Sequence, residues 1–590
     1  WLKQTRLSDS HTDIQPQIPH AVQPRLHSHG KCVTSTLGLS AMPALARKPL
    51  VDLFREEEQG KLQRELQLSD LTAIGIGGTV GSGVFSVIGK VAALESGPSV
   101  LLCVVISGFG CLLTANAYIK LSQAIPSTGA VYAWAYHTLG EVFAVVCASC
   151  LTLEYALCGC AVAVSWGNKF ADAVHLDALD EMAMGSLGVN WAAAIVCIFT
   201  TVLLLQGLSV GKTFINCMTM LKVSLIVFII VCSLCFFSVS NLSPLVPPPT
   251  IVDGKVRYGM EGLFKGSVDC FFAYVGFDEV CCLAGEAKDP RRDMPWAVLL
   301  SVLGTTLLTF MAVLGIIGMQ HYKDIDPVNG FEAGLRQHGW YLAACFINIG
   351  ELITLPLVVY LSILPQARLF YAMAMDGLLP AVFARLSHTG LLRESNLIVG
   401  VACVVFALFI DFEVLNDVIS SAVLLSFILC NCSLIMLTLT PKVPAQKAAA
   451  VEGPKGQQLR KCNGAALALY STFAFACLVL VAGLVIPGTV LTDLASAPLE
   501  MRTVAALSAA TFGLVALAAL AHLCRQSYNR KLGPVCVPAL AVLYNCVMLA
   551  TLSLRGLLII GCYFGLVLLL YFAYGTHKSA RNHDEWFRRR

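Results

Sequence analysis

Fourteen apolar stretches, each near the length that a helix needs to cross a bilayer, recur along this chain of 590 residues. About 20 mainly apolar residues span the hydrocarbon core. Hydrophobic residues make up 57% of the chain and charged residues 13%, which is too little charge to cover a water-soluble protein. We therefore expect an all-α, polytopic membrane protein. The predicted spans are 71–92, 98–119, 140–166, 189–207, 214–239, 263–285, 296–319, 341–372, 396–411, 415–439, 465–488, 501–523, 534–552 and 555–575.

The loops between these spans predict the orientation and the division of the chain. Lys and Arg gather in alternate loops, about 25 on one face against about nine on the other, and basic loops favour the cytoplasm. Both termini are therefore expected in the cytoplasm, with residues 1–65 as a disordered extension and 577–590 as a tail. Between them lie a core over 66–440, a cytoplasmic loop over 441–464 and four C-terminal spans over 465–576. We favour the plasma membrane over an internal one.

Composition and motifs exclude several classes of function. The formal net charge of +3 leaves no electrostatic footprint for nucleic acid, and most of the 24 cysteines lie in apolar runs, where they act as small hydrophobes. The sequence has no HExxH motif and no membrane cluster of nucleophile, base or metal ligands, and histidines are nearly absent from the spans. We therefore expect no enzyme, no cofactor and no metal site.

Two predicted spans contain residues that disrupt a membrane helix. In the first, Gly75–Phe85 holds five glycines within nine residues, and each costs about 1 kcal/mol relative to alanine in a helix interior. In the sixth, Phe271–Glu279 sets a glycine and two acids in an aromatic stretch. Close helix packing also selects glycine, but this density favours an interruption. Interrupted helices at corresponding positions of two halves, here about 71–239 and 263–439, predict an inverted-repeat transporter with a midplane site.

The ends of such broken helices suit the two charges of an amino acid. The half-helix after the first break exposes unpaired amides and the positive end of a helix dipole, both of which favour a carboxylate. The unwound carbonyls opposite would accept hydrogen bonds from an ammonium group. Together the two breaks predict a receptor for an α-amino acid.

The run Gly75–Phe85 resembles the helix 1 signature of the amino acid–polyamine–organocation superfamily. Other stretches resemble its cationic amino acid transporter branch and the bacterial homologues of that branch. They are Ile125–Gly129 with Tyr132 and Gly140–Glu141, Leu153–Leu157, Phe272–Asp278 with Glu286, Pro290 and Pro295, Arg368–Met373, Asp376–Pro380 and Tyr571–Gly575. The resemblance runs from about residue 66 to the last span. It implies the leucine transporter fold, a five-plus-five inverted repeat, followed by four peripheral helices.

The resemblance also implies the site residues by position. The amides of Ser82 and Gly83 would bind the substrate carboxylate, and carbonyls near Gly78 and Thr79 would bind the α-amine. Isolated aromatics in a span usually serve packing alone, but the motif position favours a gate. The remaining implied residues are Phe272, Ala273 and Val275, whose carbonyls would also take the α-amine, Phe272 and Tyr274 as aromatic gates, and Ser362 as a pocket residue that sets the room for a long side chain.

Two charged residues lie well inside predicted spans. Lys222 should face the bundle and have a partner, because a lysine at mid-membrane costs several kcal/mol. In similar proteins a lysine here occupies the volume where sodium-dependent relatives place a cation, near helices 1 and 8. The resemblance thus implies a sodium-independent transporter in which Lys222 stands in for sodium or exchanges a coupling proton. Glu154 would contact a cationic side chain or exchange a proton, with a purely structural carboxylate as the alternative.

Other charged positions admit more than one interpretation. Glu351, early in the eighth span, is either interfacial or functional. Asp278 and Glu279 follow the second break, and they either satisfy freed backbone groups or form a cytoplasmic gate with the basic loop 288–292. Lys120 stands where the branch typically has an acid; at the end of its span it can extend to the interface, but the local charge is reversed.

These observations together predict a secondary amino acid transporter that works by alternating access without sodium. Uniport, exchange and proton coupling all remain open. Cationic amino acids (arginine, lysine and ornithine) are favoured, and small neutral amino acids fit nearly as well. A non-transporting amino acid sensor on the same scaffold is a further alternative. The expected partners are an amino acid, the lipid bilayer and, in a coupled mechanism, a proton.

Overall fold

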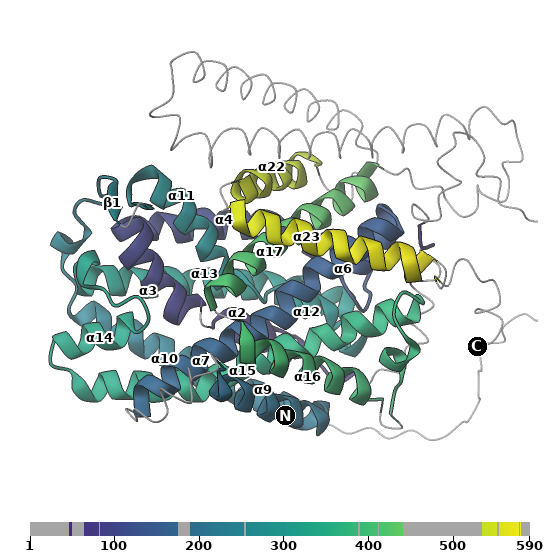
Figure 1. Ribbon diagram of the computed structural model, residues 1–590, viewed down its shortest axis with the longest axis horizontal. Coiled ribbons are helices and arrows are strands. Elements are labelled where there is room, and N and C mark those ends of the chain that lie inside the picture. Colours follow the sequence, from purple (N-terminus) through teal and green to yellow (C-terminus); the bar gives the residue numbers. More distant parts are fainter. Residues whose placement is uncertain are drawn as a thin grey trace, which may run out of the picture. The chain divides into compact units, whose positions relative to one another are not determined.

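The computed structural model describes residues 47–49, 53, 64–81, 83–174, 189–252, 255–387, 390–410, 412–439, 534–550, 554–576 and 579. In this part the protein is helical, apart from one antiparallel hairpin of β1 (Thr250–Val252) and β2 (Lys255–Arg257) (Figure 1). The predicted spans 465–488 and 501–523 lie outside the described residues.

The first half of the described chain follows the predicted spans, with the first and third helices divided into segments. The first span is the most divided, since glycine and extended residues end its regular turns. The elements are α2 (Leu68–Thr79), η2 (Gly83–Val87), α3 (Ile88–Lys90), η3 (Val91–Ser96), η4 (Gly97–Ser99), α4 (Val100–Ala124), α5 (Val131–Thr138), α6 (Glu141–Thr152), η5 (Leu153–Leu157), α7 (Cys158–Val174), α9 (Trp191–Leu205), α10 (Leu208–Cys235) and η6 (Val239–Leu242).

The second half begins after the hairpin and is divided in the same way at its first span. Its elements are α11 (Gly259–Asp269), η7 (Cys270–Tyr274), α12 (Glu279–Cys282), η8 (Ala284–Glu286), α13 (Pro290–Met319), η9 (Tyr322–Asp324), α14 (Gly330–Gln337), α15 (Tyr341–Met375), η10 (Ala381–Ala384), α16 (Arg393–Phe409), α17 (Phe412–Leu439), α22 (Cys536–Ala550), α23 (Leu554–Leu570) and η12 (Tyr571–Gly575).

Six helical stretches of the described chain are long and apolar enough to cross a membrane, and three shorter apolar helices accompany them. The six are Gly83–Ala124, Glu141–Ala171, Gly211–Cys235, Pro290–Met319, Tyr341–Met375 and Val418–Leu439, and the shorter ones are Trp191–Leu205, Cys536–Leu549 and Ile559–Gly575. The protein is therefore a multi-pass membrane protein, because only a bilayer accommodates so many apolar helices in one chain. The total of fourteen spans stays a prediction.

Two short helices connect spans where the sequence suggested only loops. Helix α5 follows Gly129 and Ala130, whose φ angles of +94° and +42° reverse the chain after α4. It ends at Thr138, and Gly140, with a φ of +117°, turns the chain into α6. Helix α14 likewise precedes α15. Both are too short to appear in a search for twenty-residue apolar runs.

The helices that carry the two breaks pack in the interior of the bundle. Helix α2 lies against α13, α10 and α15, and α12 lies against α2 and α15. Around them α4 packs on α13, α7 on α15, and α9 on α16 (Figure 1). Helices α22 and α23 both contact α17. Helix α2 is thus surrounded by helices of other spans. Its polar groups can therefore be buried in protein and kept away from lipid.

Part of the expected disordered extension is packed against the helices. Lys48 is buried, and its Nζ lies 2.6 Å from Oδ1 of Asp376, the residue that follows α15. Its backbone amide donates to the carbonyl of Tyr136 at 3.2 Å, and Nδ1 of His137 lies 2.8 Å from its carbonyl oxygen. The disorder prediction is therefore corrected at Lys48, because a buried ion pair and two backbone contacts hold that residue in place.

Candidate functional site

The first predicted interruption is present at Val80. Helix α2 ends at Thr79, and Val80 is extended with φ −77° and ψ 95°, while helical turns resume only at Gly83. The amide of Val80 still donates to the carbonyl of Ile76 at 2.9 Å, so the regular ladder stops immediately afterwards. Ser82, which the resemblance assigns to the carboxylate, lies outside the described residues.

The second predicted interruption lies between Tyr274 and Glu279. After η7, Val275 is extended with φ −63° and ψ 131°, and Gly276 has a φ of +119°. The chain returns to a helix at Glu279, where α12 begins. The hydroxyl of Tyr274 donates to the carbonyl of Val104 in α4 at 3.0 Å. This bond ties the expected aromatic gate to a neighbouring helix.

The two interruptions touch each other through their backbones. A Cβ built on Gly83 would lie 2.5 Å from Cα of Ala273 and 3.0 Å from the carbonyl oxygen of Phe272. A Cβ on Gly276 would lie 2.8 Å from the carbonyl carbon of Gly78 and from the amide nitrogen of Thr79. Only glycine permits this approach, since any side chain would overlap main-chain atoms. The structure thus places Gly83 against Phe272 and Ala273, and Gly78 and Thr79 against Gly276.

Freed backbone groups remain at the first break. Beyond the helices' own hydrogen bonds, the described residues supply no acceptor for the amides of Gly81 and Gly83. The carbonyl of Gly81 accepts from the amides of Val84 and Phe85 at 3.1 and 3.3 Å, which starts the next half-helix. Amides at the start of a half-helix attract an anion through their hydrogens and through the local dipole.

Lys222 on α10 is fully buried and reaches the first broken helix. Its Nζ donates to the carbonyl of Gly77 at 2.9 Å. A Cβ built on Gly77 would also lie 3.3 Å from a methyl carbon of Leu357 and of Leu361 in α15. The ammonium group therefore contacts the first broken helix near a turn that packs against α15, and its hydrogen-bond partner is a backbone carbonyl.

Glu154 lies in η5, a widened turn between α6 and α7, and is fully buried. Such widened turns occur frequently at functional sites. Its Oε2 accepts from Oγ of Ser426 in α17 at 3.0 Å, while its Oε1 has no hydrogen-bond partner among the described residues. The hydroxyl of the next residue, Tyr155, donates to Oδ2 of Asp278 at 2.9 Å. This bond joins the widened turn that carries Glu154 to the second break.

The cytoplasmic-gate interpretation of Asp278 and Glu279 stays a prediction. Both are buried, Asp278 is held by Tyr155, and Glu279 lies over Gly78, where a Cβ would be 2.8 Å from its Oε2. Glu286, a few residues further along, accepts from Nε and from one terminal nitrogen of Arg368 at 3.0 and 2.8 Å. Short turns after Gly276 direct the first two acids inward.

Two other results concern residues near the candidate site. Ser362 on α15 is buried and lies beside Gly159 of α7, where a Cβ built on the glycine would lie 3.3 Å from Cβ of Ser362. Glu351 is buried and paired with Lys169, with Nζ and Oε2 2.6 Å apart. Sequence reasoning did not single out Lys169, because the third helix continues beyond the apolar run that marked its end. A lysine in that continuation was the available signal.

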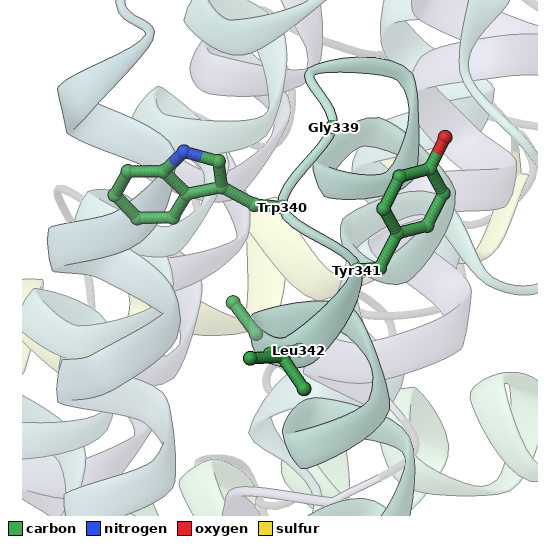
Figure 2. Close-up of a pocket in the computed structure, with 5 residues that line it drawn as sticks. Gly339, Trp340, Tyr341 and Leu342 are labelled. Atoms are coloured by element: carbon green, nitrogen blue, oxygen red, sulfur yellow. The ribbon is translucent and has the colours of Figure 1, made fainter.

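A surface hollow of about 400 Å³ lies elsewhere, at the start of α15. Its lining is Gly339–Ala343, and Figure 2 shows Trp340 and Tyr341 directed to opposite sides of the chain. None of the site residues above lines it. Exposed Trp and Tyr at a helix end are typical of the interface between membrane and water, so this hollow is assigned no role in substrate binding.

Comparison with known proteins identifies the family of the chain. Residues 66–499 match the family described as amino acid permease. The chain belongs to the amino acid permease family. It is therefore a membrane transporter by family and not an enzyme.

Individual relatives differ in what their names say they carry. The chain is 30% identical to the methylthioribose transporter of Bacillus subtilis over 66% of this chain and 85% of that one. It is 33% identical to cationic amino acid transporter 3, mitochondrial, of Arabidopsis thaliana over 64% of this chain and 63% of that one, less than two thirds of the plant protein. The branched-chain amino acid permease BcaP of Bacillus subtilis is 30% identical over 58% and 73%.

Proposed function

We propose that this permease carries amino acids across a membrane by alternating access, with the substrate held between the two interrupted helices. One observation carries the proposal: the backbones of the two breaks meet at Gly83 with Ala273 and at Gly276 with Thr79. The proposed site binds the substrate carboxylate through unpaired amides at one break and the α-amine through unpaired carbonyls at the other. One zwitterion can contact both only if the two breaks face each other.

The site assignments follow from that arrangement. The amides of Ser82 and Gly83 bind the substrate carboxylate, and the carbonyls near Gly78 and Thr79 bind the α-amine. On the facing break the α-amine meets the carbonyls of Phe272, Ala273 and Val275, with Phe272 and Tyr274 over the substrate, and Glu154 and Ser362 line the space for its side chain.

The fold that accompanies this site is a five-plus-five inverted repeat. Its halves cover about 71–239 and 263–439, each beginning with the interrupted span, and four peripheral helices follow. An N-terminal extension, a loop over 441–464 and a C-terminal tail lie in the cytoplasm, and the plasma membrane is the favoured location. The equivalent position of the two interruptions, at the first span of each half, supports the repeat.

The substrate class is a cationic amino acid. Near the second break, the buried carboxyl groups of Glu154, Asp278 and Glu279 have no ion pair among the described residues, and one buried ammonium group, that of Lys222, lies in the same region. An excess of buried acid favours a cationic ligand, since unpaired charge is costly in an apolar interior. Small neutral amino acids are the second candidate, which the branched-chain permease among the relatives supports. A sensor would bind the same ligands without moving them.

Transport is independent of sodium. Lys222 places a fixed cation within hydrogen-bonding distance of Gly77, beside the first break. A sodium ion next to it would meet an ammonium group of the same sign, at a repulsive cost of about 4 kcal/mol for unit charges 4 Å apart at an effective dielectric constant of 20. Lys222 either replaces the sodium ion or exchanges a coupling proton.

The test is uptake by purified protein in liposomes. Labelled arginine, lysine, ornithine and alanine are offered at two external pH values, with and without sodium. We expect uptake of at least one cationic amino acid at equal rates in both salts. Strict dependence on sodium would contradict the role of Lys222, and binding without uptake would identify a sensor.

The site itself is tested by Gly83→Ala. A Cβ at Gly83 would lie 2.5 Å from Cα of Ala273, so even alanine separates the two breaks. We expect uptake to fall at least tenfold while the protein still inserts in the membrane. The matched control is Gly565→Ala on α23, where a Cβ meets nothing within 4 Å. Equal uptake by both variants would remove the proposed site.

A further inference from the structure

Glu279 has no ion pair among the described residues, unlike several other buried acids of this protein. Glu286 forms an ion pair with Arg368, and Glu351 forms one with Lys169. Asp376 is paired with Lys48. Glu279 is 2% exposed, and its Oε2 has no hydrogen-bond partner among the described residues. A buried carboxylate oxygen without a donor is costly unless a cation or a donor arrives from outside the protein.

The charged groups around Glu279 do not fill that place. Lys222 on α10 is close enough for its charge to act on Glu279, but its Nζ donates to the carbonyl of Gly77. Asp278 precedes Glu279 in the chain, and its Oδ2 accepts from the hydroxyl of Tyr155 at 2.9 Å. The open Oε2 of Glu279 is therefore left for a further group.

The position of Glu279 indicates what that group is. Its Oε2 lies over Gly78, 2.8 Å from where a Cβ would stand, and the carbonyl oxygen of Gly276 is 3.8 Å from the same point. Gly78 belongs to the last turn of α2, whose carbonyls face the α-amine in the proposed site. A carboxylate at this place adds a full negative charge to a set of neutral carbonyl dipoles.

We propose that Glu279 is the counter-ion of the substrate's α-ammonium group and makes the site select primary amines at the α-carbon. The inference rests on the proposed function, and it adds a specificity-determining side chain to a site otherwise built from backbone. Lys222 nearby would repel an ammonium group, and the carboxylate of Glu279 offsets that charge. The preference it creates is for an α-amino acid over the 2-hydroxy acid of the same shape, which keeps the carboxylate and loses the charge.

The test compares each amino acid with its 2-hydroxy acid in wild type and Glu279→Gln. Arginine is paired with its 2-hydroxy analogue and alanine with lactate. Binding is followed by thermal shift of the purified protein, and transport by inhibition of labelled uptake in liposomes. For Glu279→Gln we expect the apparent affinity for both amino acids to fall tenfold or more and that for the hydroxy acids to change less than twofold. Glu279→Asp, which keeps the charge, should retain the preference.

Two control variants separate this role from others. Glu95→Gln alters another buried carboxylate whose Oε2 has no partner among the described residues, at the outer end of η3, and should leave the preference unchanged. Lys222→Gln should also retain the preference for amino acids in the binding assay. If Lys222→Gln loses it as fully as Glu279→Gln does, Glu279 acts through the lysine and the proposal fails.

The remaining outcomes are equally decisive. An equal loss for amino and hydroxy acids in Glu279→Gln would show a structural role, and a loss for arginine without one for alanine would assign Glu279 to a side-chain cation; either result overturns the proposal. Wild-type binding without uptake would contradict transport alone, since the preference is still measured by binding. No binding of any amino acid would overturn both the proposed function and the role of Glu279.

Discussion

Lys222 illustrates how a single charge is accommodated in the interior of this protein. Its ammonium group has no acid within ion-pair distance among the described residues and instead donates to the carbonyl of Gly77, close to the break in α2. A hydrogen bond to a charged group contributes about 1.5–3 kcal/mol. That bond joins α10 to the first broken helix, so the residue contributes both to packing and to the charge of the site.

Replacing this lysine should uncouple binding from transport. Lys222→Gln keeps a donor but removes the charge, and we expect uptake to fall tenfold or more because the cation beside the first break is lost. Insertion and amino acid binding should persist, as judged by gel filtration and thermal shift. The control is Lys265→Gln on α11, whose side chain is 56% exposed and paired with Glu95. Full uptake by Lys222→Gln would show that the charge is dispensable.

At the level of the elements, the two broken helices depend on glycines that lie in contact with the backbone of another segment of the same chain. Gly276 combines a φ of +119° with a contact to the backbone of Gly78 and Thr79. Gly339, in the turn between α14 and α15, has a φ of +78°, but a Cβ there would meet nothing within 4 Å. Comparing substitutions at Gly276 and Gly339 therefore separates the cost of a left-handed backbone conformation from the cost of an overlap with neighbouring backbone atoms.

Alanine at these two glycines should have very different effects. Gly339→Ala carries only the cost of a left-handed residue, about 1–2 kcal/mol, and should retain uptake. Gly276→Ala adds an overlap with main-chain atoms that has no flexible side chain to move, so uptake should be lost and the thermal transition lowered further. Uptake rates and melting temperatures of the two variants check this. Similar results for both would mean that the contact between the breaks is unimportant.

For the molecule as a whole, buried ion pairs connect segments that are far apart in sequence. Lys48 and Asp376 are 328 residues apart, Lys169 and Glu351 are 182 apart, and the hydroxyl of Tyr132 also donates to Asp376 at 2.8 Å. Removing one partner of a buried pair typically costs about 3–5 kcal/mol, because the other charge is left uncompensated. The contact of Asp376 with Lys48 holds the segment around Lys48 against the end of α15, and the pair of Lys169 and Glu351 joins α7 to α15.

Asp376→Asn should lower the stability of the whole bundle. It removes the charge that faces Lys48 and weakens the acceptor for Tyr132, so we expect a lower melting temperature of the detergent-purified protein and faster hydrogen exchange near Lys48. The control is Glu332→Gln, whose pair with Arg336 lies one helical turn away on α14, with the arginine 44% exposed. Such exposed pairs contribute about 0.3–0.5 kcal/mol. If Glu332→Gln lowered the melting temperature as much as Asp376→Asn, the prediction would be contradicted.

Sequence reasoning succeeded where the determining property is local. The described membrane helices follow the predicted apolar runs, and both interruptions lie within the glycine-containing stretches Gly75–Phe85 and Phe271–Glu279. It failed where a partner elsewhere in the chain decides: the pairing of Lys169 with Glu351 and the packing of Lys48 were both missed. Helix α5 was also missed, since it is shorter than any membrane span.

What the residues alone determine here is therefore the membrane character, the family motifs and the places where helices break, because apolarity and the conformational cost of glycine act within a few neighbouring residues. Only the tertiary structure decides which break faces which, and which buried acid has a partner. Electrostatic energy depends on distances between side chains that are tens to hundreds of residues apart in the chain. Glu286 and Glu279 are both buried acids just beyond the second break, yet packing gives Glu286 an ion pair with Arg368 and gives Glu279 none among the described residues.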